Sequence, residues 1–251
     1  MKAIILAAGY ATRLYPLTLD RPKALLPVAG RPMVEHVVGR LATMPDVDEI
    51  LLVTNAKFAG QFVEWSAGFE PPRPGLAPRV VDDGTTDESN RLGANGDLAF
   101  VLDSRGIDDD IVVIASDNLF AESLAGFSAV CRERGTPVVV LTDIGDLAEM
   151  SKYSMVEVDA TGRLTSFVEK PAEPTSTLSC IALYFYPRAT LGEVRRYLAE
   201  GNNPDQPGRF VAWLFRQQPV HTWRLEGLWY DIGGPEALQE ADRLFTELSQ
   251  S

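Results

Sequence analysis

Short apolar runs alternate with helical patterns over the first 115 residues, and this alternation constrains the fold more than any other feature. The strand candidates are continuous apolar runs at 2–7, 50–53, 79–81 and 111–115. Apolar residues recur at helical spacing over 33–41, 58–65 and 92–102. Continuous apolar strands are typical of a sheet that helices cover on both faces. We therefore predict an α/β fold with a doubly wound, Rossmann-like, mixed but mostly parallel sheet.

The periodicity changes after residue 150. Strand candidates follow one another at 154–158, 164–168 and 179–186, with little helical pattern between them. We expect these strands to form a small β-rich insertion. Helical patterns return at 191–198, 210–215 and 235–248. The sequence has no hexapeptide series of the kind that builds a left-handed β-helix.

The composition of the chain disfavours several classes of binding partner. The formal net charge of -12 disfavours binding to nucleic-acid backbones and to anionic membrane surfaces. The chain has 2 cysteines, too few for a disulfide framework, and no apolar segment of about 18 residues, the length a membrane span needs. We therefore expect a cytoplasmic protein with no nucleic-acid or membrane partner. An anionic small substrate is compatible with this charge if basic residues or a divalent cation lie at its site.

The stretch from Leu6 to Pro27 has the features of a phosphate-binding loop. Small residues follow the first strand and allow backbone N–H groups to approach an anion closely. Arg13 adds a planar guanidinium suited to bidentate phosphate contact, and Lys23 lies between two prolines that stiffen the chain. Taken singly, either side chain is better explained as a solvated surface charge.

The order of these residues resembles a known signature. Leu6-Ala7-Ala8-Gly9-x-x-Thr12-Arg13-Leu14-x-Pro16-Leu17-Thr18, followed by Pro22-Lys23-x-Leu25-Leu26-Pro27-Val28, is similar to the motif of the sugar-1-phosphate nucleotidyltransferases. That family includes glucose-1-phosphate thymidylyltransferases and mannose-1-phosphate guanylyltransferases. Many members have a glycine where Ala11 stands here.

The resemblance implies a reaction and its residues. A nucleotidyl group passes from a nucleoside triphosphate to a sugar 1-phosphate, which gives an NDP-sugar and pyrophosphate. Arg13 and Lys23 would then be catalytic. The nucleotide-binding candidates are Leu6, Ala8, Gly9, Tyr10, Thr12, Asp83, Gly93 and Ala94.

Two aspartates are candidate ligands for Mg²⁺. Asp117 follows the apolar run 111–115, where open α/β sheets place their ligands, and Asp231 lies between aromatic residues and a Gly-Gly turn. Each could also be a helix-capping residue. The resemblance assigns both to one Mg²⁺ that bridges the α-phosphate and the sugar phosphate. The acidic run 108–110 precedes its strand and is interpreted as a solvated loop.

The acceptor candidates lie in the β-rich region. Glu169-Lys170-Pro171 matches a family motif in which the glutamate contacts sugar hydroxyls and the lysine contacts the sugar phosphate. Ser154 stands where the family often has a glycine beneath the sugar. Asp83 could accept hydrogen bonds from an amino group of guanine or cytosine. Neither the nucleobase nor the sugar follows from these residues.

The resemblance covers nearly the whole chain and predicts one domain over 1–251. Residues 1–120 would mainly bind nucleotide, and 150–235 would mainly bind the sugar and supply the second metal ligand, with no C-terminal β-helix. Relatives are commonly dimers or tetramers, so a homo-oligomer is open. Two alternatives stay open: a cytidylyltransferase acting on phosphocholine or another non-sugar phosphate, and a non-catalytic sugar-nucleotide sensor. Retention of the charged residues argues against the sensor.

Overall fold

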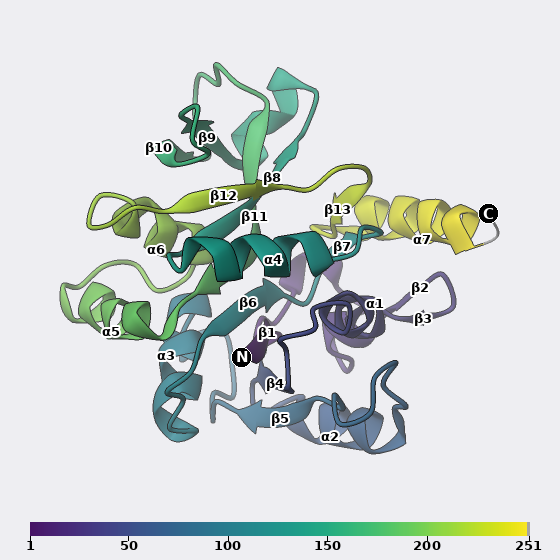
Figure 1. Ribbon diagram of the computed structural model, residues 1–251. Helices are drawn as coiled ribbons and strands as arrows, with labels where there is room; N and C mark the ends of the chain where they lie inside the picture. Colours follow the sequence, from purple (N-terminus) through teal and green to yellow (C-terminus); the bar gives the residue numbers. More distant parts are fainter. Residues whose placement is uncertain (250–251) are drawn as a thin grey trace. The chain divides into compact units, whose positions relative to one another are not determined.

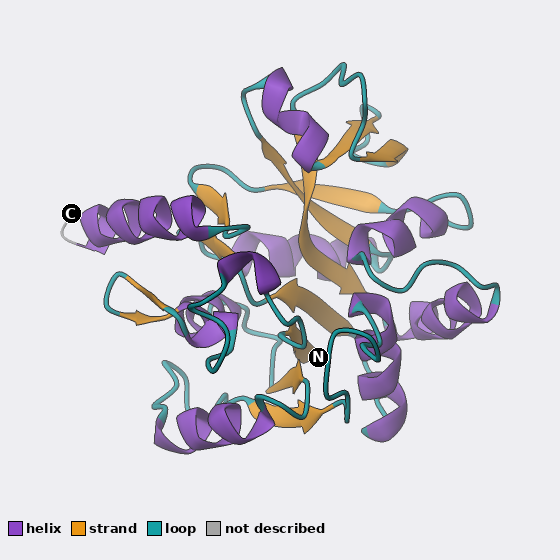
Figure 2. Cartoon of the chain, turned by 180° about the vertical axis from the view of Figure 1, so that it is seen from behind, coloured by secondary structure: helices purple, strands orange, loops and turns teal. Residues whose placement is uncertain are grey.

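The computed structural model describes residues 1–249 as two compact units whose segments alternate along the chain (Figure 1). The N-terminal unit comprises Lys2–Arg91, Ile114–Leu124 and the described residues from Gly227 onward. The central unit comprises Met1, Leu92–Val113 and Ala125–Glu226. Helices and strands are mixed along the chain (Figure 2). The predicted α/β class with a large, mostly parallel sheet is confirmed.

Three parallel strands form the framework of the N-terminal unit. β1 (Lys2–Leu6) pairs with β4 (Glu49–Thr54), and β4 pairs with β5 (Arg79–Asp82). Ile4, Ile5 and Leu52 are fully buried, as continuous apolar strands in a covered sheet should be. β6 (Ile111–Ala115), whose first three residues belong to the central unit, is buried over its first four residues. All four predicted strands are thus present.

Helices and short strands complete this unit. They are α1 (Met33–Leu41), α2 (Ala59–Gly68), α7 (Pro235–Ser249), the 3₁₀ turns η1 (Thr12–Leu14) and η2 (Lys23–Leu25), and the β2 (Pro27–Val28)–β3 (Arg31–Pro32) hairpin. α7 joins the core through Phe245, whose ring meets His36 edge-on at 5.6 Å. The Nε2 atom of His36 lies 2.8 Å from the carbonyl oxygen of Val28.

The pairing of β7 (Asn118–Phe120) with β13 (Trp229–Asp231) joins two distant parts of the N-terminal unit. The strands are antiparallel, and Asn118 is the ladder partner of Asp231. Both lie beside α7 in Figure 1. This ladder brings together the two aspartates that the sequence proposed as metal ligands.

The central unit is built on β8 (Val138–Asp143). It pairs in parallel with β12 (His221–Arg224) and antiparallel with β11 (Leu178–Tyr186). Two of the three strands expected in the insertion form it, as the antiparallel pair β9 (Ser154–Val158) and β10 (Leu164–Glu169). The third expected strand is β11, which pairs with β8 in the large sheet instead, so that part of the prediction is wrong. The helices and 3₁₀ turns are α3 (Ala94–Ser104), α4 (Ala125–Arg134), η3 (Leu147–Lys152), η4 (Arg188–Thr190), α5 (Leu191–Ala199) and α6 (Pro207–Leu214). Over residues 1–249, no helix is long and apolar enough to cross a membrane.

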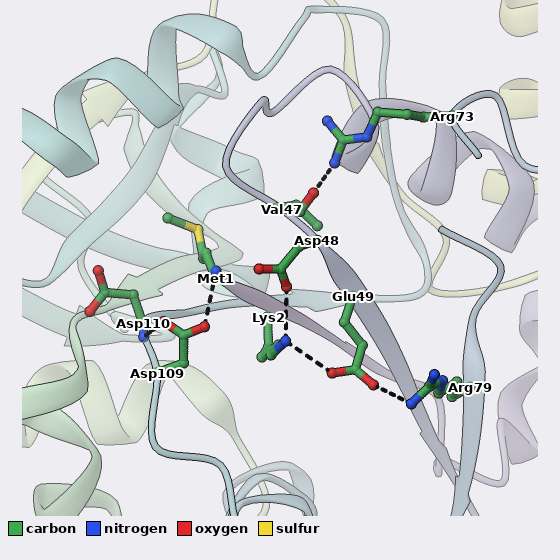
Figure 3. A network of polar contacts seen from close by, with 9 residues as sticks. All are labelled: Met1, Lys2, Val47, Asp48, Glu49, Arg73, Arg79, Asp109 and Asp110. Atoms are coloured by element: carbon green, nitrogen blue, oxygen red, sulfur yellow. Dashed lines mark hydrogen bonds and ion pairs between the residues drawn. The ribbon is translucent and has the colours of Figure 1, made fainter. Parts of the chain in front are cut away.

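Charged side chains line the starts of the N-terminal unit's strands (Figure 3). Lys2 lies 2.9 Å from Asp48 and 3.2 Å from Glu49, and Glu49 lies 2.9 Å from Arg79. Because the strands are parallel, this network is at the end opposite the loop that follows β1. In the central unit, Asp109 pairs with the amino group of Met1 at 3.0 Å. The acidic run 108–110 therefore makes structural contacts rather than forming a purely solvated loop.

Candidate functional site

Hydrogen bonds to two carbonyls fix the backbone of the loop after β1. The carbonyl of Ala7 accepts from the Thr54 hydroxyl at 3.3 Å, and that of Ala8 accepts from the Asn55 amide at 2.9 Å. In a trans peptide the N–H points opposite to the carbonyl. The N–H groups of Ala8 and Gly9 therefore point away from β4. A Cβ at Gly9 would have no atom within 4 Å, so the space beside this backbone is open.

Ala11 has a left-handed backbone, with φ 49° and ψ 43°. This conformation costs a residue with a Cβ about 1–2 kcal/mol, a cost that glycine does not have. The carbonyl of Ala11 accepts from the Thr18 hydroxyl at 2.8 Å and from the Leu14 N–H at 3.0 Å. Thr18 is fully buried, so its hydrogen bond holds Ala11 and the loop to the interior of the unit. Thr12 and Arg13, which follow in η1, are exposed.

Tyr10 and Asp83 are brought together through Thr85. The Tyr10 hydroxyl donates to the Thr85 hydroxyl at 3.4 Å, and burial raises the pKa of Tyr10. The hydroxyl and the N–H of Thr85 both donate to Oδ1 of Asp83 at 2.7 Å. One carboxylate oxygen of Asp83 is therefore engaged by its own loop. Tyr10 and Asp83 are both candidates from the sequence, and the Thr85 hydroxyl joins them.

Lys23 and Asp117 form the central ion pair of the N-terminal unit. Nζ of Lys23 lies 2.5 Å from Oδ2 of Asp117, and the two side chains are 16% and 26% exposed. Burial pushes the pKa of Asp117 up, but the charge and the hydrogen bond of Lys23 outweigh it and hold that pKa below its usual value. Asp117 is thus an ionised carboxylate with a cation seated on one oxygen.

The β7–β13 ladder places the backbone of Asp231 close to the backbone of Asp117. The N–H of Ile232 donates to the backbone carbonyl of Asp117 at 3.4 Å, one step beyond the Asn118–Asp231 pair. Asp117 and Asp231 therefore occupy adjacent positions, although 113 residues separate them in sequence.

The donor set suits a Mg²⁺ ion that phosphates and waters complete. Mg²⁺ is typically held by one or two carboxylates together with substrate phosphates. Asp117 and Asp231 supply two hard oxygen donors, and the Lys23 ammonium marks a cation position on Asp117. Across residues 1–249, no three His, Cys, Asp or Glu side chains gather into a cluster that could hold a metal ion. Two carboxylates would leave the remaining coordination positions of a Mg²⁺ ion to phosphates and waters.

Asn118 was overlooked as a site residue. Its side-chain oxygen accepts from the indole N–H of Trp229 at 3.0 Å, and its amide nitrogen donates to Oδ1 of Asp117 at 3.3 Å. Asn118 is 4% exposed. No local sequence pattern indicates that Asn118 bonds to Trp229, because Trp229 lies 111 residues away.

The acceptor candidates belong to the central unit. Glu169 is the ladder partner of Ser154. The Ser154 hydroxyl donates to the Cys180 carbonyl at 3.0 Å and accepts from the Cys180 N–H at 3.2 Å, so it is engaged by β11. Burial raises the pKa of Glu169, against the opposing charges of Lys170 and Arg209. Lys170 is exposed and has a left-handed φ of 48°.

Gly208 lies directly against the Glu169 carboxylate. A Cβ added at Gly208 would lie 3.1 Å from Oε2 of Glu169 and 3.2 Å from Cζ of Phe167. α6 can pack this close to the acidic side chain because position 208 has no side chain. No local sequence pattern marks this glycine.

Gly93 and Ala94 meet a loop of the same unit. The N–H groups of Ala94 and Asn95 donate to the carbonyls of Asp205 and Pro204, at 3.4 and 2.8 Å. The predicted helix over 92–102 therefore begins two residues later, at Ala94. Loop carbonyls, rather than a preceding side chain, satisfy its first donors.

The two cysteines and His221 have surroundings typical of structural residues. Cys131 is fully buried, and burial raises the pKa of Cys180 far above its usual value. His221 lies on β12 with Nδ1 2.7 Å from the Thr136 hydroxyl.

Comparison with known proteins identifies the family. The family model described as "Nucleotidyl transferase" matches residues 2–247. The chain belongs to this family. The predicted family is therefore confirmed, and the match covers the loop, both aspartates and the acceptor candidates.

Individual relatives differ in nucleotide and in length. A mannose-1-phosphate guanyltransferase candidate of Sulfolobus acidocaldarius is 30% identical over 240 residues, covering 94% of this chain but 60% of the relative. The UTP–glucose-1-phosphate uridylyltransferase AglF of Haloferax volcanii is 27% identical over 253 residues, covering 100% of this chain and 99% of the relative. A solved UDP-glucose pyrophosphorylase with bound UDP-glucose shares the fold, with TM-score 0.81 at 19% identity, covering 98% of each chain.

Proposed function

We propose that the protein transfers a nucleotidyl group from a nucleoside triphosphate to a sugar 1-phosphate, with Mg²⁺ as cofactor. The observation that carries this proposal is the Lys23–Asp117 pair beside Asp231, in the same unit as the loop after β1. Family membership supports the reaction class, and relatives named for guanylyl, uridylyl and thymidylyl transfer support the sugar 1-phosphate acceptor.

The chemistry is a displacement at phosphorus. An oxygen of the sugar phosphate attacks the α-phosphorus, the α–β anhydride bond breaks, and pyrophosphate leaves with the bonding electrons. Both reactants are anions, so the site must neutralise charge rather than supply a covalent nucleophile. Arg13, Lys23 and the N–H groups of Ala8 and Gly9 provide positive charge and donors for this purpose.

When bound, Mg²⁺ would neutralise phosphate charge and polarise the phosphoryl group. Asp117 and Asp231 are the residues that would hold it. Lys23 also has a role before the metal arrives, because its ammonium keeps Asp117 ionised. The proposed order of events is that phosphate groups attract Lys23 and expose Oδ2 of Asp117.

The central unit would bind the acceptor. A carboxylate at Glu169 accepts hydrogen bonds from sugar hydroxyls, and the Lys170 ammonium neutralises the attacking phosphate. The relatives differ in nucleobase, and the sugar is equally open. A cytoplasmic location and association of copies stay predictions.

A substrate matrix tests the proposal. Five nucleoside triphosphates are combined with several sugar 1-phosphates and with phosphocholine, and pyrophosphate release is measured with Mg²⁺ and with EDTA. We expect release with at least one sugar 1-phosphate and none with EDTA. Reaction of CTP with phosphocholine alone would establish the cytidylyltransferase alternative. Absence of reaction in every combination would favour a sugar-nucleotide sensor.

A further inference from the structure

Three side-chain hydrogen bonds form a continuous path that ends on Asp117. The indole N–H of Trp229 donates to Oδ1 of Asn118, the amide of Asn118 donates to Oδ1 of Asp117, and Lys23 donates to Oδ2 of Asp117. All four residues belong to the N-terminal unit. Both oxygens of the Asp117 carboxylate are thus held from fixed directions.

The indole determines how the Asn118 amide is oriented. An indole N–H donates and cannot accept, so the amide must turn its oxygen toward Trp229. The NH₂ group then faces Asp117, where it meets an acceptor-only carboxylate. Without Trp229, the amide could rotate and present its oxygen to Asp117, and two acceptors would oppose each other.

The backbone of Asn118 also aligns the second aspartate. Asn118 is opposite Asp231 in the β7–β13 ladder, and Trp229 lies two residues before Asp231 on the same face of β13. The Trp229–Asn118 bond therefore braces the ladder step that carries Asp231. Asn118 therefore contacts Asp117 through its side chain and pairs with Asp231 in the β7–β13 ladder.

We propose that Asn118 is a positioning residue that fixes the Asp117 carboxylate for a divalent cation, and that Trp229 acts through it. The inference rests on the proposed function, because it takes Asp117 as a metal ligand. Residues that orient a ligand typically change metal affinity 10–100-fold when they are replaced. Asn118 belongs to this class rather than to the groups that touch the reacting atoms.

Direct metal binding tests the inference without turnover. Mn²⁺ is titrated into the full chain by electron paramagnetic resonance, with a non-hydrolysable triphosphate present. Trp229→Phe keeps the ring and removes the donor, and Asn118→Leu keeps the volume and removes the amide. We expect each variant to weaken Mn²⁺ binding about tenfold. The double variant should bind no more weakly than Asn118→Leu alone, because both changes interrupt one path.

A matched control separates positioning from general stability. Trp65 also donates its indole N–H to a side chain of the same unit, Glu35 at 3.0 Å. Trp65→Phe should lower the melting temperature to a similar degree and leave Mn²⁺ affinity unchanged. Asp117→Asn should abolish the binding that the other variants weaken.

The result that would overturn the inference is wild-type Mn²⁺ affinity in folded Trp229→Phe, or equal weakening in Trp65→Phe. If Asn118→Leu does not fold, Trp229→Phe alone decides. Normal pyrophosphate release by the wild type alongside unaltered Mn²⁺ binding in Trp229→Phe would reject the positioning role and leave the proposed function standing. Failure of the wild type in every substrate combination would reject the proposed function instead.

Discussion

Replacing Gly93 with alanine should destabilise the central unit strongly. Gly93 has φ 79° and ψ 160°, a backbone region that side chains rarely adopt, and this strain costs about 1–3 kcal/mol. A Cβ would also lie 2.8 Å from the carbonyl carbon and oxygen of Pro204 and 2.9 Å from Cα of Asp205. These are backbone atoms, so they cannot move aside as a flexible side chain could. Overpacking of this kind adds about 1–3 kcal/mol.

The two costs together predict a loss of roughly 3 kcal/mol in the free energy of unfolding. With a urea slope of about 2 kcal/mol per molar, the midpoint should fall by about 1.5 M. Gly201→Ala is the matched control, because Gly201 lies in the same unit, has φ 78° and has open space where a Cβ would be. It should lose only about 1 kcal/mol, or about 0.5 M.

Urea unfolding followed by circular dichroism measures both variants, and triphosphate KM is measured in the folded protein. Equal midpoints for Gly93→Ala and Gly201→Ala would refute the reasoning. If Gly93→Ala also raised KM for the triphosphate with no extra loss of stability, the glycine would serve the nucleotide alone. The structural explanation requires the stability loss to appear without substrate.

Three further predictions concern charge and strain. Ala11→Gly should raise the free energy of unfolding by about 0.5 kcal/mol, the strain relieved less the entropy that glycine costs, as thermal unfolding would show; a loss would contradict the left-handed geometry. Glu169→Gln should stabilise the protein at pH 7 but not at pH 4. Burial raises the pKa of Glu169, so the ionisation of this side chain lowers the stability of the fold only at pH values above the usual titration range of a glutamate. Equal effects of the substitution at both pH values would exclude this cause. Lys23→Ala should abolish pyrophosphate release with the fold intact by circular dichroism. Its stability deficit should be full at pH 7 and shrink as pH falls below about 4, because Lys23 lowers the pKa of Asp117; an unchanging deficit would count against that coupling.

The parts of the fold that could be predicted are those with local signals. The buried runs that became β1 and β6 are continuous and apolar, so their strand character does not depend on distant residues. The run that became β8 has the same character and was not recognised as a strand, although the signal was present. The start of α3 had no local signal, because carbonyls more than 100 residues away satisfy its first donors.

The candidate site likewise contains residues that the sequence indicates and residues that it does not. Lys23, Asp117 and Asp231 stand in ordered motifs, and the structure brings them together within one unit. Asn118 and Thr18 act through partners that the sequence does not indicate: an indole 111 residues away and a carbonyl in a strained loop. The engagement of Ser154 by Cys180 depends on strand packing, which no motif reveals. Residue types were predictable, whereas their mutual orientation was not.

The alternation of segments between the two units has a consequence for synthesis on the ribosome. The N-terminal unit needs Gly227 and the residues after it, because α7 supplies Phe245 to its core and Asp242 accepts from the N–H of Ala29 at 2.8 Å. The first 91 residues therefore wait, without their closing helix, while the whole central unit is translated. The paired aspartates also cannot meet before β13 has emerged. Nascent chains cut off before residue 227 should thus lack the proposed metal site entirely and be targets for chaperones and proteases.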